Sequence, residues 1–287
     1  MEITKDCKIG IVGLGLMGGA IAMALKNNDI VQAENLYALD VNQDTLRDVK
    51  AAGVIGQSFT DPNKMLPLCD IVFLCLNPST LLNFMQNHMA AFKSNALITD
   101  IAGTKQNIVS VMEKTLRPDL DFIPGHPMAG SEKGGFENAR FCNFSGKNYI
   151  LTPLERNKKE NIDFIKELIH CMGFGRVTIT SAEEHDRKIA FTSQLCHVIA
   201  AALVDCESDT EITRFGGGSF EDLTRIAMLN APMWTELFIE NRGDLLPRIE
   251  QFEESLDKIR KLITCGNDKA LKETLAVIRD RRIAMSV

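Results

Sequence analysis

The chain has 287 residues and a formal net charge of -6 at pH 7, which argues against a general nucleic-acid or anionic-membrane surface, because such surfaces are usually basic. Its length exceeds that of one typical domain and predicts two, with enough chain to bury a core without disulfides or metal ions. No apolar run of about 18 residues indicates a membrane span, and the N-terminal segment contains no apolar secretory stretch.

The eight cysteines are scattered along the chain and form no C-x-x-C pair. Several lie inside apolar runs, such as Cys75 in IVFLCL, where cysteine behaves as a small hydrophobic residue. We therefore expect reduced thiols, a cytoplasmic location and no metal site.

The first part of the chain alternates short apolar runs with segments of helical periodicity. Strands are predicted at 8–14, 36–40, 70–76, 96–100, 122–124, 149–152 and 176–180, and helices at 15–27, 42–52, 79–92 and 104–116. The run 70–76 is apolar almost throughout, as expected for a central parallel strand buried on both faces. This alternation predicts an α/β fold with a doubly wound sheet of the Rossmann type.

The pattern changes after residue 180, where only helices are predicted. They cover 183–206, 221–229, 232–262 and 268–283. The chain is therefore predicted to consist of a nucleotide-binding domain at 1–180 and an all-helical domain at 181–287. No flexible linker separates the two parts, so we expect them to pack together with a cleft between them.

A glycine motif connects the first predicted strand to the first predicted helix. It reads Gly13-Leu-Gly15-Leu16-Met17-Gly18. Gly13 permits a tight turn, Gly15 lets the backbone approach a pyrophosphate, and Gly18 lets helix and strand pack closely, while the helix N-terminus favours negative charge. The strand-turn-helix context favours a dinucleotide site over a glycine turn without a ligand.

Residues at the ends of two further predicted strands fit the same site. Asp40 ends the second strand, and an acid there binds the ribose hydroxyls and repels a 2′-phosphate, which favours NAD over NADP. The alternative is a plain strand-end aspartate. Asn77 and Pro78 follow the central strand at its carboxyl edge, where cofactor loops lie in this fold.

A histidine stands between glycine and proline in the segment Pro124-Gly-His126-Pro-Met-Ala-Gly-Ser131-Glu132-Lys-Gly-Gly135. Proline and glycine restrict the loop backbone, so a side chain at this place is held rather than free. A lone histidine usually has a structural role. Its position after a dinucleotide fold instead favours a catalytic one.

Four segments resemble the prephenate dehydrogenase family. They are TDIAGTK (99–105), GHPMAGSEKGG (125–135), EEHDRKIAFTSQLCH (183–197) and GGGSFEDLTRIA (216–227), the last followed by PMW (232–234). The resemblance implies a Rossmann domain followed by a helical dimerisation domain, hence a homodimer with NAD as cofactor. It also implies the oxidative decarboxylation of prephenate to 4-hydroxyphenylpyruvate and CO2 in tyrosine biosynthesis, or the oxidation of arogenate. The two acids are not distinguished by the sequence.

The resemblance also implies roles for single residues. His126 matches the catalytic histidine that binds the substrate's ring hydroxyl, and Arg225 matches the arginine that binds a substrate carboxylate. His197, Glu132 and Trp234 match residues of the substrate pocket. A salt bridge for Arg225 and a core position for Trp234 are the alternatives.

Further members of the matching segments are also expected near the ligands. Ser131 and Thr104 are expected at the substrate and Asp100 at the cofactor, whereas His185 is expected to have a structural or supporting role. Two departures from the family pattern matter. Gly103 stands where the family often has a serine, so a hydroxyl that assists His126 is missing or comes from Thr104. The helix motif S-H-L-P-H reads SQLCH (193–197), which puts the substrate preference in doubt.

Two other functions remain open. The β-hydroxyacid dehydrogenases share the glycine motif and a helical second domain, but they need a catalytic lysine, and the surroundings of Lys188 do not match it. A non-catalytic NAD-binding sensor would not need His126, Arg225 and His197 together.

Overall fold

Six parallel strands form the main sheet of the structure, a computed structural model that describes residues 5–285. They are β1 (Ile9–Val12), β2 (Leu36–Leu39), β3 (Gln57–Phe59), β4 (Ile71–Leu74), β5 (Leu97–Asp100) and β6 (Asp121–Ile123). The order in the sheet is β3-β2-β1-β4-β5-β6. The direction of winding changes between β1 and β4, and ligands bind at such a switch point, at the carboxyl ends of the strands.

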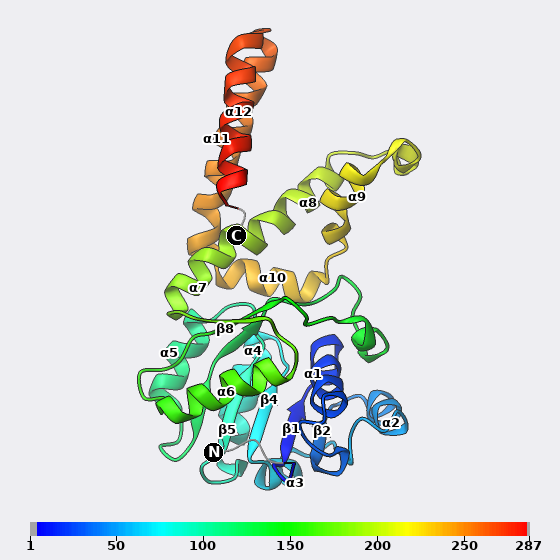
Figure 1. Ribbon diagram of the computed structural model, residues 1–287, viewed down its shortest axis with the longest axis vertical. Coiled ribbons are helices and arrows are strands. Elements are labelled where there is room, and N and C mark those ends of the chain that lie inside the picture. Colours follow the sequence, from blue (N-terminus) through cyan, green and yellow to red (C-terminus); the bar gives the residue numbers. More distant parts are fainter. Residues whose placement is uncertain (1–4, 286–287) are drawn as a thin grey trace. The chain divides into compact units, whose positions relative to one another are not determined.

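Helices cover both faces of this sheet (Figure 1). Residues of α1 (Leu16–Asn27), α2 (Gln43–Ala51) and α6 (Lys159–Cys171) belong to one buried apolar cluster, and residues of α3 (Pro62–Met65), α4 (Pro78–His88) and α5 (Gln106–Thr115) to the other. Alternate residues of β4 enter the two clusters, so this strand is buried on both faces as predicted. The predicted α/β class is confirmed, although β3 and α6 were not predicted.

A smaller sheet contains β7 (Gly125–Pro127), β8 (Asn148–Leu151) and β9 (Arg176–Ile179). Strands β7 and β8 are antiparallel, and His126 is the register partner of Ile150. The prediction that His126 lies in a loop is therefore wrong. Pairing with β8 along one edge of β7 holds this residue more firmly than a loop would.

The part of the chain after residue 180 is helical, as predicted. A continuous helix consists of α7 (Ala182–Ile189), a π-helical segment (Ala190–Gln194) and α8 (Leu195–Asp205), followed by α9 (Gly218–Thr224) and α10 (Ala231–Glu240). The described residues up to Asn241 form one compact unit, and those from Arg242 onwards form a second. The predicted helix 232–262 is wrong in one respect, because Asn241 separates α10 from α11.

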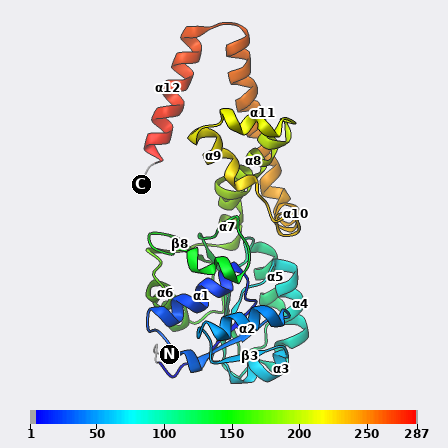
Figure 2. The ribbon, with the colours of Figure 1, turned by 90° about the vertical axis from the view of Figure 1, so that its right-hand side faces the viewer.

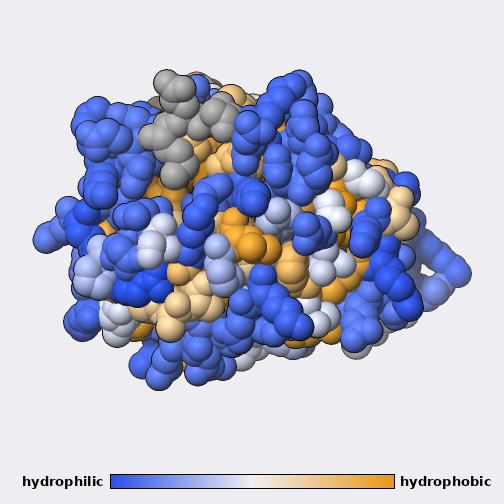
Figure 3. All heavy atoms as spheres, turned by 90° about the horizontal axis from the view of Figure 1, so that it is seen from below, coloured by the Kyte–Doolittle hydropathy of each residue, from blue (hydrophilic) through white to orange (hydrophobic). Residues whose placement is uncertain are grey.

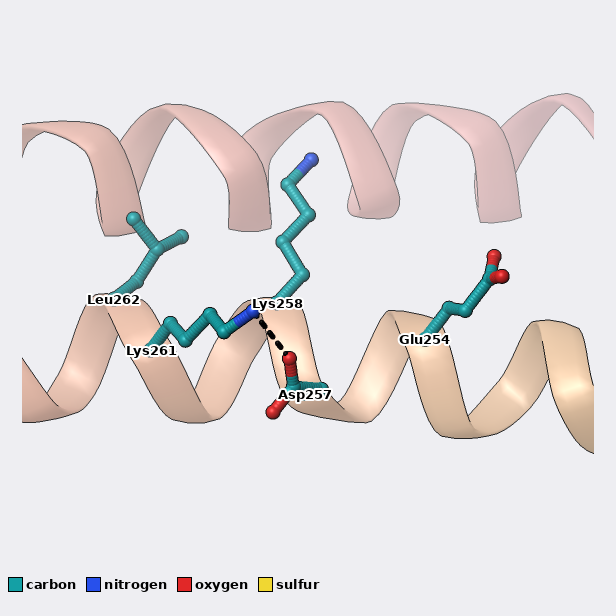
Figure 4. Close-up of a pocket in the computed structure, with 5 residues that line it drawn as sticks. All are labelled: Glu254, Asp257, Lys258, Lys261 and Leu262. Carbon is teal, nitrogen blue, oxygen red and sulfur yellow. Dashed lines mark ion pairs between the residues drawn. The ribbon is translucent and has the colours of Figure 1, made fainter.

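The second unit consists of α11 (Arg242–Thr264) and α12 (Asp268–Ala284), which contact each other. Figure 2 shows the two helices as a hairpin. A shallow depression on it is lined by Glu254, Asp257, Lys258, Lys261 and Leu262 (Figure 4). Lys261 pairs with Asp257 one helical turn away, at 2.7 Å. These side chains make an ordinary solvated helix face, and none of them is a predicted site residue.

The expectation that no segment is apolar enough to span a membrane needs a correction at one helix. By length and composition alone, the helix Ala182–Asp205 is apolar enough to cross a bilayer, and 28% of its most apolar window is buried inside the described chain. One such helix is weak evidence for a membrane span. Elsewhere, Figure 3 shows a face on which hydrophilic side chains predominate and apolar ones gather in small areas between them.

Candidate active site

The glycine turn between β1 and α1 needs glycine at two positions. Gly13 has a φ of 88°, and a Cβ on it would lie 2.5 Å from the backbone oxygen of Cys75 on the neighbouring chain segment. A Cβ on Gly18 would collide with the backbone oxygen of Gly13. The residue types of the motif are thus explained by backbone packing at the switch point of the sheet.

The same turn leaves room for a ligand at the start of α1. Gly15 is the N-cap of this helix, no side chain caps it, and a Cβ on Gly15 would meet no atom within 4 Å. The backbone N–H groups of Leu16, Met17 and Gly18 lie in the first turn, where a helix offers them no internal acceptor. These donors and the helix dipole fit a phosphate group, so the residues present fit a dinucleotide.

Asp40 lies at the carboxyl end of β2 and touches the glycine turn. Its carboxylate accepts the backbone N–H of Leu14 at 2.6 Å and that of Asn42 at 2.8 Å. It therefore holds the turn in place and keeps further lone pairs for a ligand. At the end of β4, Asn77 is the N-cap of α4 and Pro78 its first residue, so both lie at the same edge of the sheet as the turn.

His126 belongs to a row of three side chains. Its Nδ1 lies 2.9 Å from Nε2 of His185, and Nδ1 of His185 lies 2.6 Å from Oδ1 of Asp186. Both partners are buried on α7, a helix that begins after Ser181, whose hydroxyl accepts the backbone N–H of Glu184. Within residues 5–285, Nε2 of His126 has no hydrogen-bond partner, and the His126 side chain is only partly buried.

The surroundings of this row favour neutral imidazoles. Burial, then His185 and then Lys105 hold the pKa of His126 well below its ordinary value. Burial also lowers the pKa of His185, although Asp186 opposes that shift. A histidine with a lowered pKa is neutral at neutral pH and can accept a proton.

Asp100 has a different place from the one expected. Its side chain is fully buried, pairs with the equally buried Lys105 at 2.5 Å, and accepts the backbone N–H groups of Gly125 at 2.9 Å and Ala102 at 2.8 Å. Burial lowers the pKa of Lys105, and Asp100 opposes this. The Asp100 carboxylate thus connects β5 to β7. Its contact with a cofactor stays a prediction, and no atom of this side chain is exposed.

Arg225 and Glu132 pair with each other. Arg225 donates to Glu132 at 2.9 Å, and its side chain is 57% exposed. A backbone hydrogen bond and then Arg225 lower the pKa of Glu132. Ser131 is exposed and accepts the backbone N–H of Lys133 at 3.1 Å. The salt bridge that was the alternative prediction for Arg225 is present, and it leaves more than half of the Arg225 side chain exposed.

His197 stacks on Trp234, with ring centroids 3.7 Å apart. Its Nδ1 lies 2.9 Å from the backbone oxygen of Ser193, so Nδ1 carries the proton and Nε2 is left as the second polar atom. Burial lowers the pKa of His197, and the charge of Arg225 lowers it further. Trp234 also contacts Phe238 along α10, at 5.3 Å between centroids.

The departures from the family pattern are explained by contacts with α10 and the residue after it. Thr104 is buried and donates to Glu240 at 2.6 Å, so its hydroxyl does not assist His126 here. A Cβ on Gly103 would lie 3.2 Å from the side chain of Leu237. Gln194 is buried, donates to the backbone oxygen of Leu237 and accepts from Asn241, and is therefore a structural residue.

Metal-binding groups were not expected. Among residues 5–285 no group of three or more His, Cys, Asp or Glu side chains is arranged to hold a metal ion. The eight cysteines are free thiols, and Cys196 of the SQLCH motif is exposed.

Comparison with known proteins identifies the family. Residues 21–178 match the model of the prephenate dehydrogenase nucleotide-binding domain, and residues 181–277 match that of the prephenate dehydrogenase dimerization domain. This chain belongs to the prephenate dehydrogenase family. It is therefore an oxidoreductase of the group that carries out oxidative decarboxylation in tyrosine synthesis.

Relatives match over nearly the whole chain. Prephenate dehydrogenase of Bacillus subtilis is 31% identical over 98% of this chain and 76% of its own length. Cyclohexadienyl dehydrogenase of Zymomonas mobilis is 32% identical over 96% of this chain and 95% of its own length. A crystal structure of prephenate dehydrogenase from A. aeolicus, in complex with hydroxyphenyl propionate and NAD+, has 29% identity and a TM-score of 0.86, and the match covers 99% of this chain and all of that one.

Some contributors to the site were missed by the sequence reasoning. Asp186 and Glu240 hold His185 and Thr104 in place, yet neither was singled out as a functional residue. The adjacent His-Asp pair near the start of a predicted helix was the available signal for Asp186. No local signal marked Glu240, because its partner Thr104 lies 136 positions away, between β5 and α5.

Proposed function

We propose that this member of the prephenate dehydrogenase family uses NAD to convert prephenate to 4-hydroxyphenylpyruvate and CO2 in tyrosine biosynthesis. The observation that carries the proposal is the free Nε2 of His126. This nitrogen belongs to a neutral imidazole held by β7 and His185. Because the backbone of Gly125 is bound to Asp100 at the carboxyl end of β5, His126 lies at the same edge of the main sheet as the dinucleotide-type glycine turn. A neutral, held imidazole is what a general base at a substrate hydroxyl requires.

The proposed reaction combines hydride transfer, removal of the hydroxyl proton and loss of CO2. Prephenate has a carbinol opposite a ring carbon that bears a carboxylate, and bound NAD would accept a hydride from the carbinol carbon. His126 takes the hydroxyl proton at Nε2, so the carbinol becomes a ketone. The ring carboxylate then leaves as CO2, and its bonding electron pair makes the ring aromatic. The ring oxygen takes back the proton held by His126 and becomes the hydroxyl group of 4-hydroxyphenylpyruvate.

The cofactor proposal rests on the glycine turn and Asp40. The open N-terminus of α1 suits the pyrophosphate, and the lone pairs that Asp40 keeps suit the ribose hydroxyls. A carboxylate at this place repels the additional phosphate of NADP. The A. aeolicus relative was crystallised with NAD+, which supports the same choice.

Arg225 and His197 are proposed as the polar anchors of the substrate. The accessible guanidinium of Arg225 can pair both oxygens of a carboxylate, with Glu132 as the partner it gives up or shares. Prephenate and arogenate share both carboxylates and differ at one side-chain carbon, which bears a keto oxygen in prephenate and an ammonium group in arogenate. Glu132, the acid that could receive the ammonium group, is already paired with Arg225, and this favours prephenate.

Assembly is proposed to be a two-fold homodimer in the cytoplasm. The family's dimerization domain spans 181–277, and large apolar side chains on its described helices are exposed, among them Leu203, Val204, Ile239 and Leu256. Pairing would cover such surface and explains the apolar helix Ala182–Asp205 without a membrane. Light scattering should give about twice the mass of 31.8 kDa, and a single-chain mass in dilute solution would contradict the dimer.

The proposed function is tested by assaying NAD reduction with each acid separately. Prephenate should be oxidised with the higher kcat/KM, and the product should be 4-hydroxyphenylpyruvate with one CO2 released per hydride. Oxidation of arogenate alone would keep the family but overturn the substrate.

A further inference from the structure

The row His126, His185 and Asp186 determines where each proton lies. A carboxylate only accepts hydrogen bonds, so Nδ1 of His185 carries a proton and donates a hydrogen bond to Asp186 at 2.6 Å. Nε2 of neutral His185 is then an acceptor. The contact at 2.9 Å therefore places a proton on Nδ1 of His126 and leaves a lone pair on its Nε2.

We propose that His185, oriented by Asp186, is a positioning residue that keeps His126 in the tautomer with a basic Nε2. The inference rests on the proposed role of His126 as the base. When Nε2 of His126 takes the substrate proton, Nδ1 keeps its hydrogen bond to His185. The positive charge on His126 is then separated from the carboxylate of Asp186 by the ring of His185 alone.

The charges around the row support this role. Asp100 and Lys105 form a buried ion pair that is neutral as a whole, so Asp186 is the negative charge left over near the histidines. A proton on His126 would balance it. A fixed negative charge at this place offsets part of the cost that burial, His185 and Lys105 impose on an imidazolium at His126.

The row is held from three sides, which keeps its geometry fixed. Asp186 accepts the backbone N–H groups of Lys105 at 2.8 Å and Gln106 at 2.9 Å, at the start of α5. Its own backbone oxygen accepts from Asn241 at 3.0 Å, and Asn241 also donates to Gln194. The position of His185 thus depends on α5, on α7 and on the residue that ends α10.

The row also explains how the site works without a serine at Gly103. The hydroxyl expected from the family pattern is absent, and Thr104 donates to Glu240 instead. Nδ1 of His126 nevertheless has a hydrogen-bond partner, because Nε2 of His185 lies beside it. The partner that fixes the base therefore comes from α7.

A pair of variants tests the role of His185. His185→Phe fills the space with a ring that accepts no hydrogen bond, whereas His185→Gln keeps an oxygen near the place of Nε2. We expect His185→Phe to lower kcat on the order of 10- to 100-fold, below the roughly 10⁴-fold that a wrong tautomer costs in the serine-protease triad. KM for prephenate and the Kd of NAD should stay unchanged. His185→Gln should recover most of kcat. Equal losses in the two variants would overturn the proposal.

A double-mutant cycle separates positioning from a structural role. In a His126→Asn background no base remains for His185 to orient, so His185→Phe should cost no further activity. A purely structural residue would cost the same factor in both backgrounds, and that result would contradict the proposal.

The tautomer can also be measured without any substitution or activity. The chain has five histidines, so ¹⁵N-histidine labelling and long-range ¹H–¹⁵N spectra can resolve each ring, with His126→Asn assigning the signal. His126 should be protonated on Nδ1 and bare on Nε2. A proton on Nε2 of neutral His126 would refute the inference even if His126 proves to be the base. If His126 is protonated on Nδ1 as expected but the His126→Asn enzyme is still active, the proposed function is refuted instead.

Discussion

The glycine turn and the histidine row lie at the same edge of the main sheet but depend on different physical features. At the turn, function depends on backbone shape, since Gly13 and Gly18 are the residues that fit beside other main-chain atoms. In the row, the proposed proton transfer depends on two side chains that are 59 positions apart, those of His126 and His185. Backbone requirements leave a compact motif in a sequence, whereas side-chain assemblies become visible only after the chain has folded.

Two glycine substitutions sharpen this comparison and have the largest expected effect. Gly13→Ala places a Cβ against the oxygen of Cys75 at a positive φ, which costs roughly 1–3 kcal/mol in backbone strain alone. We expect a clear drop in Tm and loss of NAD binding. Gly15→Ala is the matched control, because its Cβ meets open space. It should keep the wild-type Tm and weaken only NAD binding. Equal Tm losses would mean that Gly15 is needed for folding.

Arg225→Ala tests the substrate end of the site. A hydrogen bond to a charged group contributes about 1.5–3 kcal/mol, so loss of a carboxylate pair should raise KM for prephenate on the order of 10²-fold while the Kd of NAD stays the same. Arg214→Ala is a suitable control, since this exposed arginine pairs with Glu211 one turn away. An unchanged KM in Arg225→Ala would place the substrate carboxylate elsewhere.

Asp40 should have a smaller, selective effect. If it binds the adenosine ribose, the wild-type enzyme should show a kcat/KM at least about tenfold higher with NAD than with NADP. Asp40→Asn keeps an oxygen for the N–H of Leu14 and removes the charge, so it should narrow this ratio without a large loss of Tm. Comparable kcat/KM values for the two cofactors in the wild type would remove Asp40 from this role.

Much of the main sheet was predictable because its strands are apolar and its helices are periodic. Strand β4 illustrates this, since a run buried on both faces leaves an unbroken apolar sequence. Strands β3 (QSF) and β7 (GHP) have three residues each and contain no apolar run, which is why β3 was not predicted and a loop was expected at His126.

The candidate site was predictable only in part. Motif residues such as Gly13, Asp40 and His126 could be named from the sequence. Their partners could not, because the direction of a side chain is set by contacts such as that of Thr104 with Glu240, which join segments 136 positions apart. Asp100 is likewise placed by its own contacts, with Lys105 and with the backbone of Gly125, which lies 25 positions away.

The central claim is that neutral His126 accepts the hydroxyl proton, and the pH dependence of kcat for wild-type and His126→Asn enzymes tests it most directly. Because the pKa of His126 is lowered in the structure, wild-type activity should persist below pH of about 6.5 and fall only on further acidification. His126→Asn should fold, bind NAD normally, lose on the order of 10²–10⁴ in kcat and show no acid limb. A His126→Asn enzyme with near-normal kcat and an unchanged pH profile would contradict the account.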